Sequence, residues 1–298
     1  MGIFKNLFKG RDTLKQDLSD KQQPGGIFIV HLLFEEKCGM PDRELMKSVM
    51  DRHMGENELF TYNKTTASFA AKKYTAEFKD GAVPPMLTIM GCTEITDWQP
   101  DDLTMSQMWD CPEKDEIFEK CRYQVVATDM MGAGVPYKSR ADMLMDFTEA
   151  LLEMFPGCRA VMFDASGKMF TREAFLGRDI PREDRFVYFA VNVRFFRIEG
   201  TEDMLVDTLG MGTLFLPDLQ YHFHGMDQNA VVNHACNTLL YIYANECPIK
   251  SGDTIDGIKD GKLCREIQWK CQFENSLIQP LREVIDINMD EYASGKRG

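Results

Sequence analysis

Three of the chain's five histidines, His222, His224 and His234, lie in a short stretch that also contains Asp218 and Gln220. Imidazole nitrogens and carboxylate oxygens bind divalent metals when they converge from a rigid frame. They are also groups with which a hydrolase activates water. The stretch therefore has the residue types of a metal site or of a histidine general base.

The residues around these histidines predict a strand followed by a helix. Apolar and polar side chains alternate from Asp218 to His224, which is the period of a strand with one buried face. The predicted buried face has Leu219, Tyr221 and Phe223, and the predicted polar face has Asp218, Gln220, His222 and His224. Asp227 is the expected N-cap of a helix that ends near Asn245. Its apolar stripe consists of Val231, Ala235, Leu239 and Ile242.

The strand and the helix give the metal hypothesis its geometry. His222 and His224 are two residues apart on a strand and point the same way, and His234 could approach from the helix. The spacing of the three histidines matches no metal motif, so the polar face of an ordinary sheet is the competing interpretation. The sequence predicts no cofactor.

A row of polar residues recurs at every fourth position of the predicted helix: Asn229, Asn233, Asn237, Tyr241 and Asn245. Asparagine is a poor helix former, so such a row needs tertiary or functional compensation. We expect a ligand site where the strand's polar face meets the N-terminal half of the helix. Its candidate residues are Asp218, Gln220, His222, His224, Asn229, Asn233 and His234. In the alternative interpretation the row binds water, and the histidines pack under the loop at 252–257.

Other chemical signatures fail on spacing. His234 and Cys236 are two apart on a helix and point about 200° apart, which excludes a thiol nucleophile with its base. Gly132 and Gly134 lack the third glycine of a dinucleotide loop. The Gly167–Lys168 pair lacks the hydroxyl residue of a P-loop, so we interpret both glycine sites as turns.

The composition disfavours nucleic acids and anionic membranes as partners and favours a cytoplasmic location. The 298 residues have a net charge of -13, which disfavours binding to nucleic acid phosphates or to anionic lipid. The nine cysteines include no CxxC pair, which favours reduced thiols in a cytoplasm. The sequence has neither a secretory apolar region nor an apolar run long enough to span a membrane.

The order of predicted elements indicates an α+β fold. Strands at 27–34, 67–78, 86–92 and 123–130, with a helix after Pro41 and another at 105–120, give the βαββαβ order of a ferredoxin-like unit. A helix from Ser139 begins a second unit, followed by strands at 159–164 and 186–198, a short helix from 201 to Gly210 and the strand at 219–223. The long helix and strands at 263–273 and 281–287 complete the chain. The predicted domains are a flexible tail (1–25), two tandem units (26–130 and 131–290) in one compact body, and a disordered end (291–298).

Several stretches resemble a known bacterial family. LPDLQYHFHG, the long helix after it and GDTI are similar to the C-terminal signature of domain of unknown function 4261. CRAVMFDASGKMFTREAF, HLLFEE and YQVVATD resemble earlier segments of that family, so the likeness extends from Ile27 to Met289. The resemblance implies a bacterial, soluble, cytoplasmic protein and says nothing of an activity.

These observations favour a cytoplasmic binding or protein-interaction protein without catalysis. Its partner would be a protein or a small molecule, and a homodimer is compatible with the predicted sheets. The alternative is a hydrolase that uses a metal or a histidine base on the face of Asp218, His222 and His224.

Overall fold

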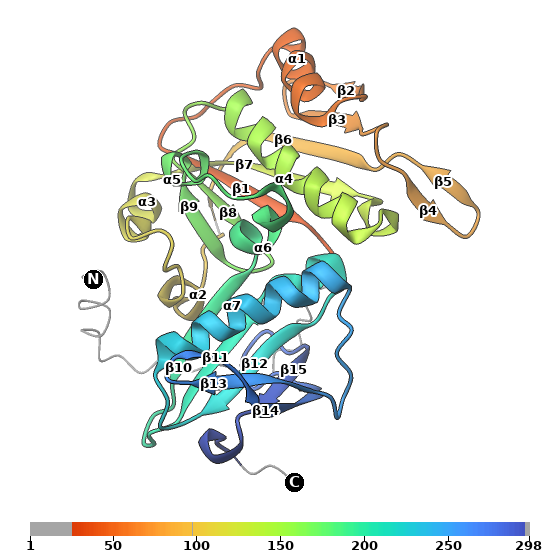
Figure 1. The fold of residues 1–298 in the computed structure, drawn as a ribbon. Coiled ribbons are helices and arrows are strands. Elements are labelled where there is room, and N and C mark those ends of the chain that lie inside the picture. The colour runs from red at the N-terminus through yellow and green to blue at the C-terminus, as the bar shows by residue number, and fades with distance from the viewer. Residues whose placement is uncertain (1–25, 97, 296–298) are drawn as a thin grey trace.

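The computed structural model describes residues 26–96 and 98–295, and two β-sheets dominate it (Figure 1). The predicted flexible tail, 1–25, and residues 296–298 of the predicted disordered end lie outside the described residues. Residues 291–295 pack on the second sheet, where Tyr292 O accepts a hydrogen bond from His224 N at 2.9 Å and Ser294 N donates to His222 O at 2.9 Å. The prediction of a disordered end is therefore wrong for 291–295.

The first sheet has seven strands in the order β2-β3-β6-β7-β1-β8-β9, and each neighbouring pair is antiparallel. Its strands are β1 (Ile29–Phe34), β2 (Glu58–Tyr62), β3 (Thr66–Ala70), β6 (Met86–Glu94), β7 (Tyr123–Met130), β8 (Ala160–Phe163) and β9 (Lys168–Thr171). A separate hairpin consists of β4 (Ala76–Phe78) and β5 (Gly81–Val83). β1 lies inside the sheet, as its apolar residues on both faces predict, and Leu32 and Leu33 on opposite faces are both fully buried.

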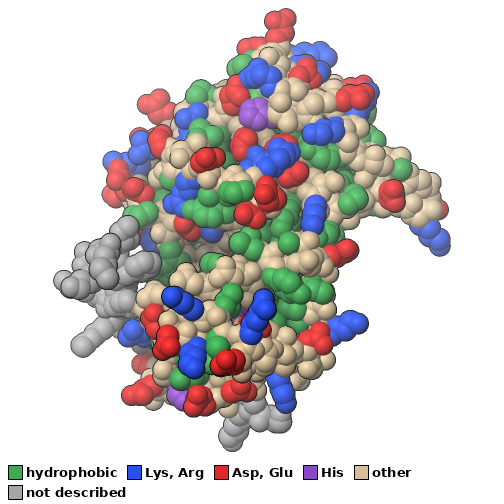
Figure 2. Space-filling model, in the orientation of Figure 1, with side chains coloured by type: hydrophobic (Ala, Val, Ile, Leu, Met, Phe, Trp, Pro, Cys, Tyr) green, Lys and Arg blue, Asp and Glu red, His purple; other side chains and the backbone are tan. Residues whose placement is uncertain are grey.

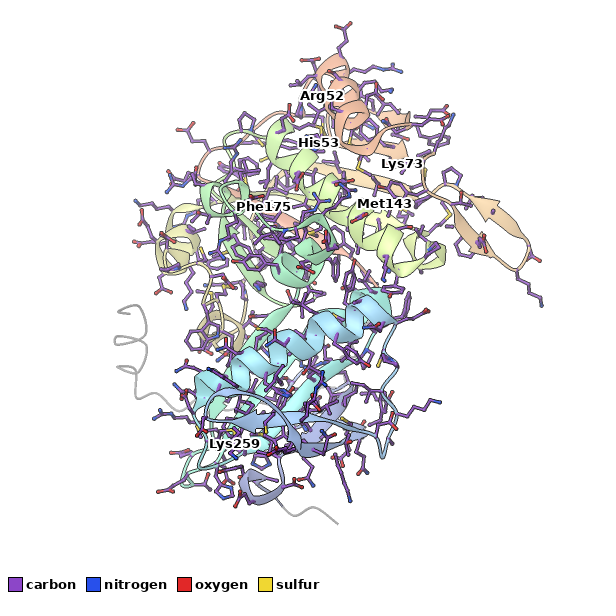
Figure 3. All side chains as sticks on the ribbon, viewed as in Figure 1. Arg52, His53, Lys73, Met143, Phe175 and Lys259 are labelled. Atoms are coloured by element: carbon purple, nitrogen blue, oxygen red, sulfur yellow. The ribbon has the colours of Figure 1, made fainter. Side chains whose placement is uncertain are left out.

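Helices cover both faces of the first sheet. α1 (Arg43–Met54) and α4 (Tyr137–Met154) pack side by side on one face, where His53 Nε2 lies 2.8 Å from Glu153 Oε2 (Figure 3). On the other face α3 (Lys114–Lys120) places Ile117 in a cluster with Leu33. The single helix predicted at 105–120 is instead α2 (Asp102–Ser106) followed by α3, because Pro112 disfavours a helical conformation at Cys111.

The second sheet has six strands in the order β10-β11-β12-β15-β14-β13. They are β10 (Asn192–Arg197), β11 (Met204–Leu209), β12 (Asp218–Phe223), β13 (Thr254–Lys259), β14 (Lys262–Asn275) and β15 (Glu283–Asn288). β12 and β15 are parallel, and the other neighbours are antiparallel. α7 (Gln228–Asn245) crosses this sheet on the side that faces the first sheet (Figure 1).

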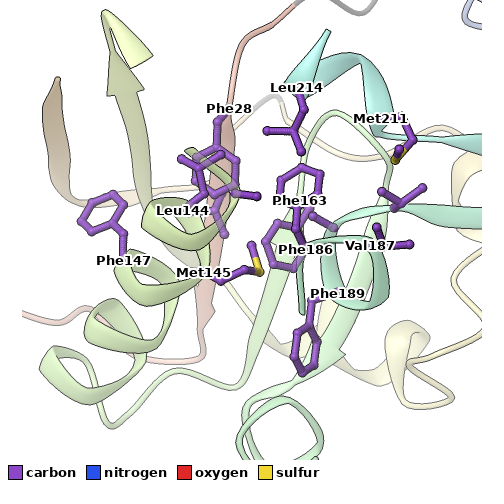
Figure 4. Packing of buried hydrophobic residues seen from close by; sticks show 14 of the residues in the cluster. Phe28, Leu144, Met145, Phe147, Phe163, Phe186, Val187, Phe189, Met211 and Leu214 are labelled. Carbon is purple, nitrogen blue, oxygen red and sulfur yellow. The ribbon is translucent and has the colours of Figure 1, made fainter. Parts of the chain in front are cut away.

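One hydrophobic core joins the two sheets. Phe163 of β8, Phe186 of α6 (Arg185–Ala190) and Leu214 of the 3-10 turn η4 (Met211–Leu214) gather in it, with α4 alongside (Figure 4). Tyr137 OH donates to Tyr243 O at 2.8 Å between α4 and α7. The remaining short helices are α5 (Arg172–Leu176), η2 (Gly132–Gly134), η3 (Arg182–Asp184) and η5 (Asp290–Tyr292).

The mixed α+β class is confirmed, whereas the tandem ferredoxin-like units are not. One βαββαβ succession can be followed through β1, α1, β6, β7, α4 and β8, with the sheet order β6-β7-β1-β8. It takes α4 and β8 from the predicted second unit, so the boundary at residue 130 falls inside the first sheet. The second sheet has only the 3-10 turn η4 and no α-helix between β10 and β12, so it does not repeat this order.

Three local predictions are also wrong. Residues 186–190 begin the predicted strand at 186–198 but form α6, which follows Pro181 and the turn η3. The short helix predicted from 201 to Gly210 is β11, whose Asp207 is buried against arginines from other segments. The predicted loop at 252–257 contains the start of β13.

Candidate functional site

β12 has one face under α7 and one face turned away from it. Leu219, Tyr221 and Phe223 are fully buried, as their alternation predicts, and the Tyr221 hydroxyl reaches α7. Side chains alternate along a strand, so Asp218, Gln220 and His222, here called the β12 polar face, lie on the side that α7 does not cover. The predicted meeting of this polar face with the N-terminal half of α7 does not occur.

Asp218 belongs to a buried network of ion pairs. Arg282 donates from Nε to Asp218 Oδ2 at 3.1 Å and from Nη2 to Asp207 Oδ2 at 2.8 Å. Arg194 Nη2 donates to Asp207 Oδ2 at 2.6 Å. Burial raises the pKa of Asp218, and the neighbouring Arg282 opposes that effect. Two arginines thus balance two aspartates, and Asp218 is committed to holding β11, β12 and the segment before β15 together.

Both side-chain amide atoms of Gln220 are hydrogen-bonded to neighbouring residues. Its Nε2 donates to Asp286 Oδ1 on β15 at 3.1 Å, and its Oε1 accepts from Leu277 N at 2.7 Å. The strand register places Asp207, Gln220 and Asp286 in one row across the sheet. This row is structural, because Gln220 is paired with Asp286, Asp207 is paired with two arginines, and all three side chains are buried.

His222 and His224 contact the C-terminal segment of the chain. His224 Nδ1 lies 3.1 Å from Ser294 Oγ, and Ser294 Oγ also donates to Asp203 Oδ1 at 2.8 Å. His222 Nε2 lies 3.6 Å from Asp203 Oδ2. These two histidines therefore help to hold residues 292–295 at the C-terminal end of β12.

His234 is a buried core residue that fastens α7 to the sheet. Its Nε2 lies 2.7 Å from Asp256 O, which can only accept, so Nε2 holds the proton and Nδ1 accepts from Tyr221 OH at 2.9 Å. Burial lowers the pKa of His234, which keeps the ring neutral. The alternative interpretation, in which a histidine packs under the segment at 252–257, is correct for His234.

The seven predicted site residues thus occupy separate places. Asn229 and Asn233 are exposed on α7, Asp218 and Gln220 are buried behind the sheet, and His234 lies between α7 and β13. Within residues 26–96 and 98–295, no group of three or more histidine, cysteine or acidic side chains could hold a metal ion. His222, His224 and His234, which were candidate metal ligands, do not converge, because the strand and the helix present them in different directions.

The structure places a cavity of about 450 Å³ on the other side of α7, between this helix and α6. Hydrophobic side chains reach the surface in the band between the two sheets (Figure 2). The cavity has an apolar wall and a polar part. The apolar wall consists of Trp109, Ile180, Pro181, Val187, Tyr188, Val191, Val193, Phe195, Val232, Leu239 and Leu240. The polar part consists of Asp110, Lys168, Asp184, Asn192, Gln228, Asn229 and Cys236. We call this space the α7 cavity.

α7 packs on the second sheet with one face and lines the α7 cavity with another, because apolar side chains occupy both faces. Val231, Ala235 and Ile242 are fully buried toward the second sheet, as the sequence predicts. Val232 and Cys236, one helical turn apart, line the α7 cavity instead. His234 and Cys236 therefore lie on different sides of the helix, which agrees with their exclusion as a catalytic pair.

Lys168 forms the charged floor of the α7 cavity. Its ammonium donates to Tyr188 O at 2.6 Å and to Val191 O at 2.9 Å, and it lies 3.5 Å from Asp110 Oδ2. Burial lowers the pKa of Lys168, and Asp110 opposes that effect. Arg178 donates to Asp110 Oδ1 at 3.4 Å and to the Tyr188 hydroxyl. The polar groups of the floor are thus hydrogen-bonded to one another or to backbone carbonyls, and the walls above them are apolar.

Cys236 lies in the α7 cavity but lacks the features of a nucleophile. Burial raises the pKa of its thiol, with Asp110 acting in the same direction and Lys168 against it. A reactive cysteine needs a lowered pKa or an adjacent base. The thiol is therefore a polarizable part of the wall.

A wider groove of about 610 Å³ lies between α7 and β13. Its lining includes Asn237, Tyr241 and Asp253, so it offers less apolar surface than the α7 cavity does. Two members of the predicted asparagine row face this groove, while Asn229 lines the α7 cavity.

Sequence reasoning missed the residues that form the α7 cavity. Asp110, Lys168, Tyr188 and Cys236 come from four distant segments, and Lys168 begins a strand where we predicted only a turn. The signal that could have found the cavity is a second stripe of α7 at Val232, Cys236 and Leu240, because a helix that is apolar on two sides must contact two bodies.

The fold and the cavity define a mixed α+β protein whose two sheets enclose an apolar pocket beside a long helix. Residues 207–288 match the model of the domain of unknown function (DUF4261), which confirms the resemblance for that segment. The match covers β11 to β15 with α7, a shorter stretch than the likeness from Ile27 to Met289. No curated protein and no solved structure matches the chain. None of the helices within the described residues combines the length and the hydropathy that a membrane crossing requires.

Proposed function

We propose that this protein is a non-catalytic binding protein whose ligand, a small and mainly apolar molecule without negative charge, occupies the α7 cavity. The observation on which the proposal rests is a half-open pocket of about 450 Å³ with mostly apolar walls. Binding sites for small molecules have volumes of roughly 300–1,000 Å³, apolar linings and a few polar groups that orient the ligand.

The charges of the lining support an uncharged or cationic ligand. Asp110 and Asp184 contribute two carboxylates, and Lys168 contributes one ammonium that Asp110 and two carbonyl oxygens already engage. Arg178 also pairs with Asp110, so an anion is disfavoured by the Asp184 carboxylate and by the net charge of -13 of the chain. Asn192, Gln228 and Asn229 offer amides that can donate to or accept from a neutral ligand.

The same groups argue against catalysis at this place. The Lys168 donors are committed to backbone carbonyls, and the Cys236 thiol has a raised pKa. The alternative, a hydrolase on the face of Asp218, His222 and His224, receives no support from the geometry, because Asp218 is buried with Arg282 and Thr208. We also propose a bacterial cytoplasm as the location, which the nine free thiols support.

Fluorescence titration with N-phenylnaphthylamine, a neutral apolar dye, tests the proposal. We expect saturable binding of one dye per chain, and weaker binding of the anionic dye anilinonaphthalene sulfonate. Val232→Trp, at a half-buried position of the cavity wall, should reduce the affinity for the neutral dye at least about tenfold, the equivalent of roughly 1.4 kcal/mol. Asn233→Trp, on the exposed side of the same helix, is the matched control and should bind as the native chain does. Equal binding by both variants would place the dye elsewhere and reject the proposal.

A further inference from the structure

Two cysteines that are 54 positions apart in sequence meet near the C-terminal end of β6 in the first sheet. Cys38 lies in the segment between β1 and α1, and Cys92 lies on β6. The backbone N of Cys38 donates to Cys92 Sγ at 3.4 Å, which places the sulfur of Cys92 against the backbone of Cys38. Both side chains are half-buried, so small reagents can reach them.

The surroundings distinguish this pair from other cysteines of the chain. The thiols of Cys158, Cys247 and Cys271 donate to backbone carbonyls. At the Cys38–Cys92 pair the sulfur of one cysteine instead accepts from the backbone N–H of the other, at 3.4 Å. A disulfide requires a short approach between two cysteine residues, and this contact brings the Cys92 sulfur to residue 38.

The backbone on each side of the pair is irregular. Cys38 belongs to a segment without helix or strand, and the pairing of β6 with β7 shifts register between Met90 and Thr93, next to Cys92. Both cysteines pack at the margin of the main core. Irregular backbone at a margin can adjust to the geometry of a covalent bond more easily than the centre of a sheet can.

We propose that Cys38 and Cys92 form a reversible disulfide when the chain meets a low-molecular-weight disulfide such as glutathione disulfide. One protein thiolate attacks a sulfur of glutathione disulfide, which forms a mixed disulfide and releases one glutathione thiolate. The second protein thiolate then attacks the protein sulfur of the mixed disulfide and releases the second glutathione. Two cysteines are oxidised, one glutathione disulfide is reduced to two glutathiones, and the two thiol protons pass to the departing thiolates.

The surroundings of Cys38 slow its reaction. Burial, together with the adjoining Cys92, raises the pKa of Cys38 to about 12. A thiol with so high a pKa forms little thiolate, so the step in which Cys38 attacks is slow. The resulting bond encloses α1 and the four strands β2 to β5 in one loop, and it ties the segment before α1 to β6.

Oxidation of the native chain with excess glutathione disulfide, followed by alkylation and peptide mapping, tests the inference. We expect a cross-linked peptide that joins Cys38 to Cys92 and a melting temperature raised by several degrees, since the bond closes a long loop. Dithiothreitol should reverse both changes. Cys38→Ser should leave Cys92 as a mixed disulfide with glutathione, while the control Cys264→Ser, on the second sheet, should keep the cross-link.

Peptide mapping of the native chain shows whether the Cys38–Cys92 disulfide forms, even if a variant does not fold. The inference is overturned if the half-buried Cys264 becomes modified while Cys38 and Cys92 both remain thiols. It is equally overturned if either cysteine of the pair accumulates as a mixed disulfide or links to a different cysteine.

Discussion

The β12 polar face and the α7 cavity lie on opposite sides of the second sheet and its helix, and they treat polar groups differently. On the polar face Asp218 and Gln220 are buried, and their side-chain atoms pair with Arg282, Thr208, Asp286 and Leu277. In the α7 cavity a small polar floor at Lys168 lies below walls that leave an apolar space unfilled. The polar residues that are concentrated around β12 in the sequence thus hold the second sheet together. The binding site that we propose lies in the α7 cavity, where apolar surface is left uncovered.

The largest effect that separates the two regions should come from Arg282→Ala. This change leaves the buried carboxylates of Asp207 and Asp218 without one of their cations, and breaking a buried ion pair costs about 3–5 kcal/mol. Urea denaturation measures the loss in the free energy of unfolding. Arg265→Ala is the control, because the Arg265 side chain is 95% exposed and should leave stability unchanged. A loss below about 1 kcal/mol for Arg282→Ala would mean that the network is not a scaffold.

Tyr221→Phe should have the next largest effect. It removes the hydroxyl that donates to His234 Nδ1 and keeps the buried ring, so a buried acceptor loses a principal donor. The expected cost is about 1–3 kcal/mol in the free energy of unfolding. A nearly neutral substitution would contradict the assignment of the His234 tautomer.

A smaller, pH-dependent effect should follow from the burial of His234. Burial lowers its pKa in the folded chain below the ordinary value of 6.5, so the unfolded chain binds the proton more readily. The stability contributed by the neutral ring is fully present above about pH 6.5 and is lost as the pH falls toward the folded-state pKa. Urea midpoints between pH 8 and pH 5 should therefore fall more steeply for the native chain than for His234→Gln. Equal slopes for the two chains would show that His234 does not titrate differently on folding.

The smallest effect is expected from the double change His222→Ala, His224→Ala. Both rings are partly exposed and contact residues 292–295, so the free energy of unfolding should fall by about 1 kcal/mol or less. Binding of N-phenylnaphthylamine should stay within about twofold of the native affinity, because neither ring lines the cavity. A loss of dye binding in this variant would move the ligand site to the polar face.

The parts of the fold that could be predicted from sequence are those that local chemistry determines. Asp227 accepts from Asn229 N as the N-cap of α7, and the strand at 123–130 follows its own alternation. β11 could not be recognised, because the burial of Asp207 depends on Arg194 and on Arg282, which lies 75 positions away. Acidic residues before β11 and Gly210 after it are typical of the two ends of a short helix. The local propensities of the residues between them were not strong enough to predict a strand instead.

The candidate site depended still more on long-range contacts. The histidine cluster was visible because its members are close in sequence, yet β12 and α7 turn His222 and His234 in different directions. The α7 cavity was hidden because Asp110, Lys168 and Cys236 meet only after both sheets have formed. Residues that are close in sequence were therefore chosen as the candidate site, although they are structural, and the residues of the α7 cavity were missed because they are far apart in sequence.

The most direct test of the central claim is a crystal structure of the chain soaked with N-phenylnaphthylamine. The account predicts electron density for the dye between α7 and α6, in contact with Val232, Tyr188 and Cys236. It also predicts an unchanged β12 polar face, with Arg282 still paired to Asp218. Density for the dye at His222 and His224, or only in the groove by Tyr241, would contradict the assignment of the α7 cavity as the binding site.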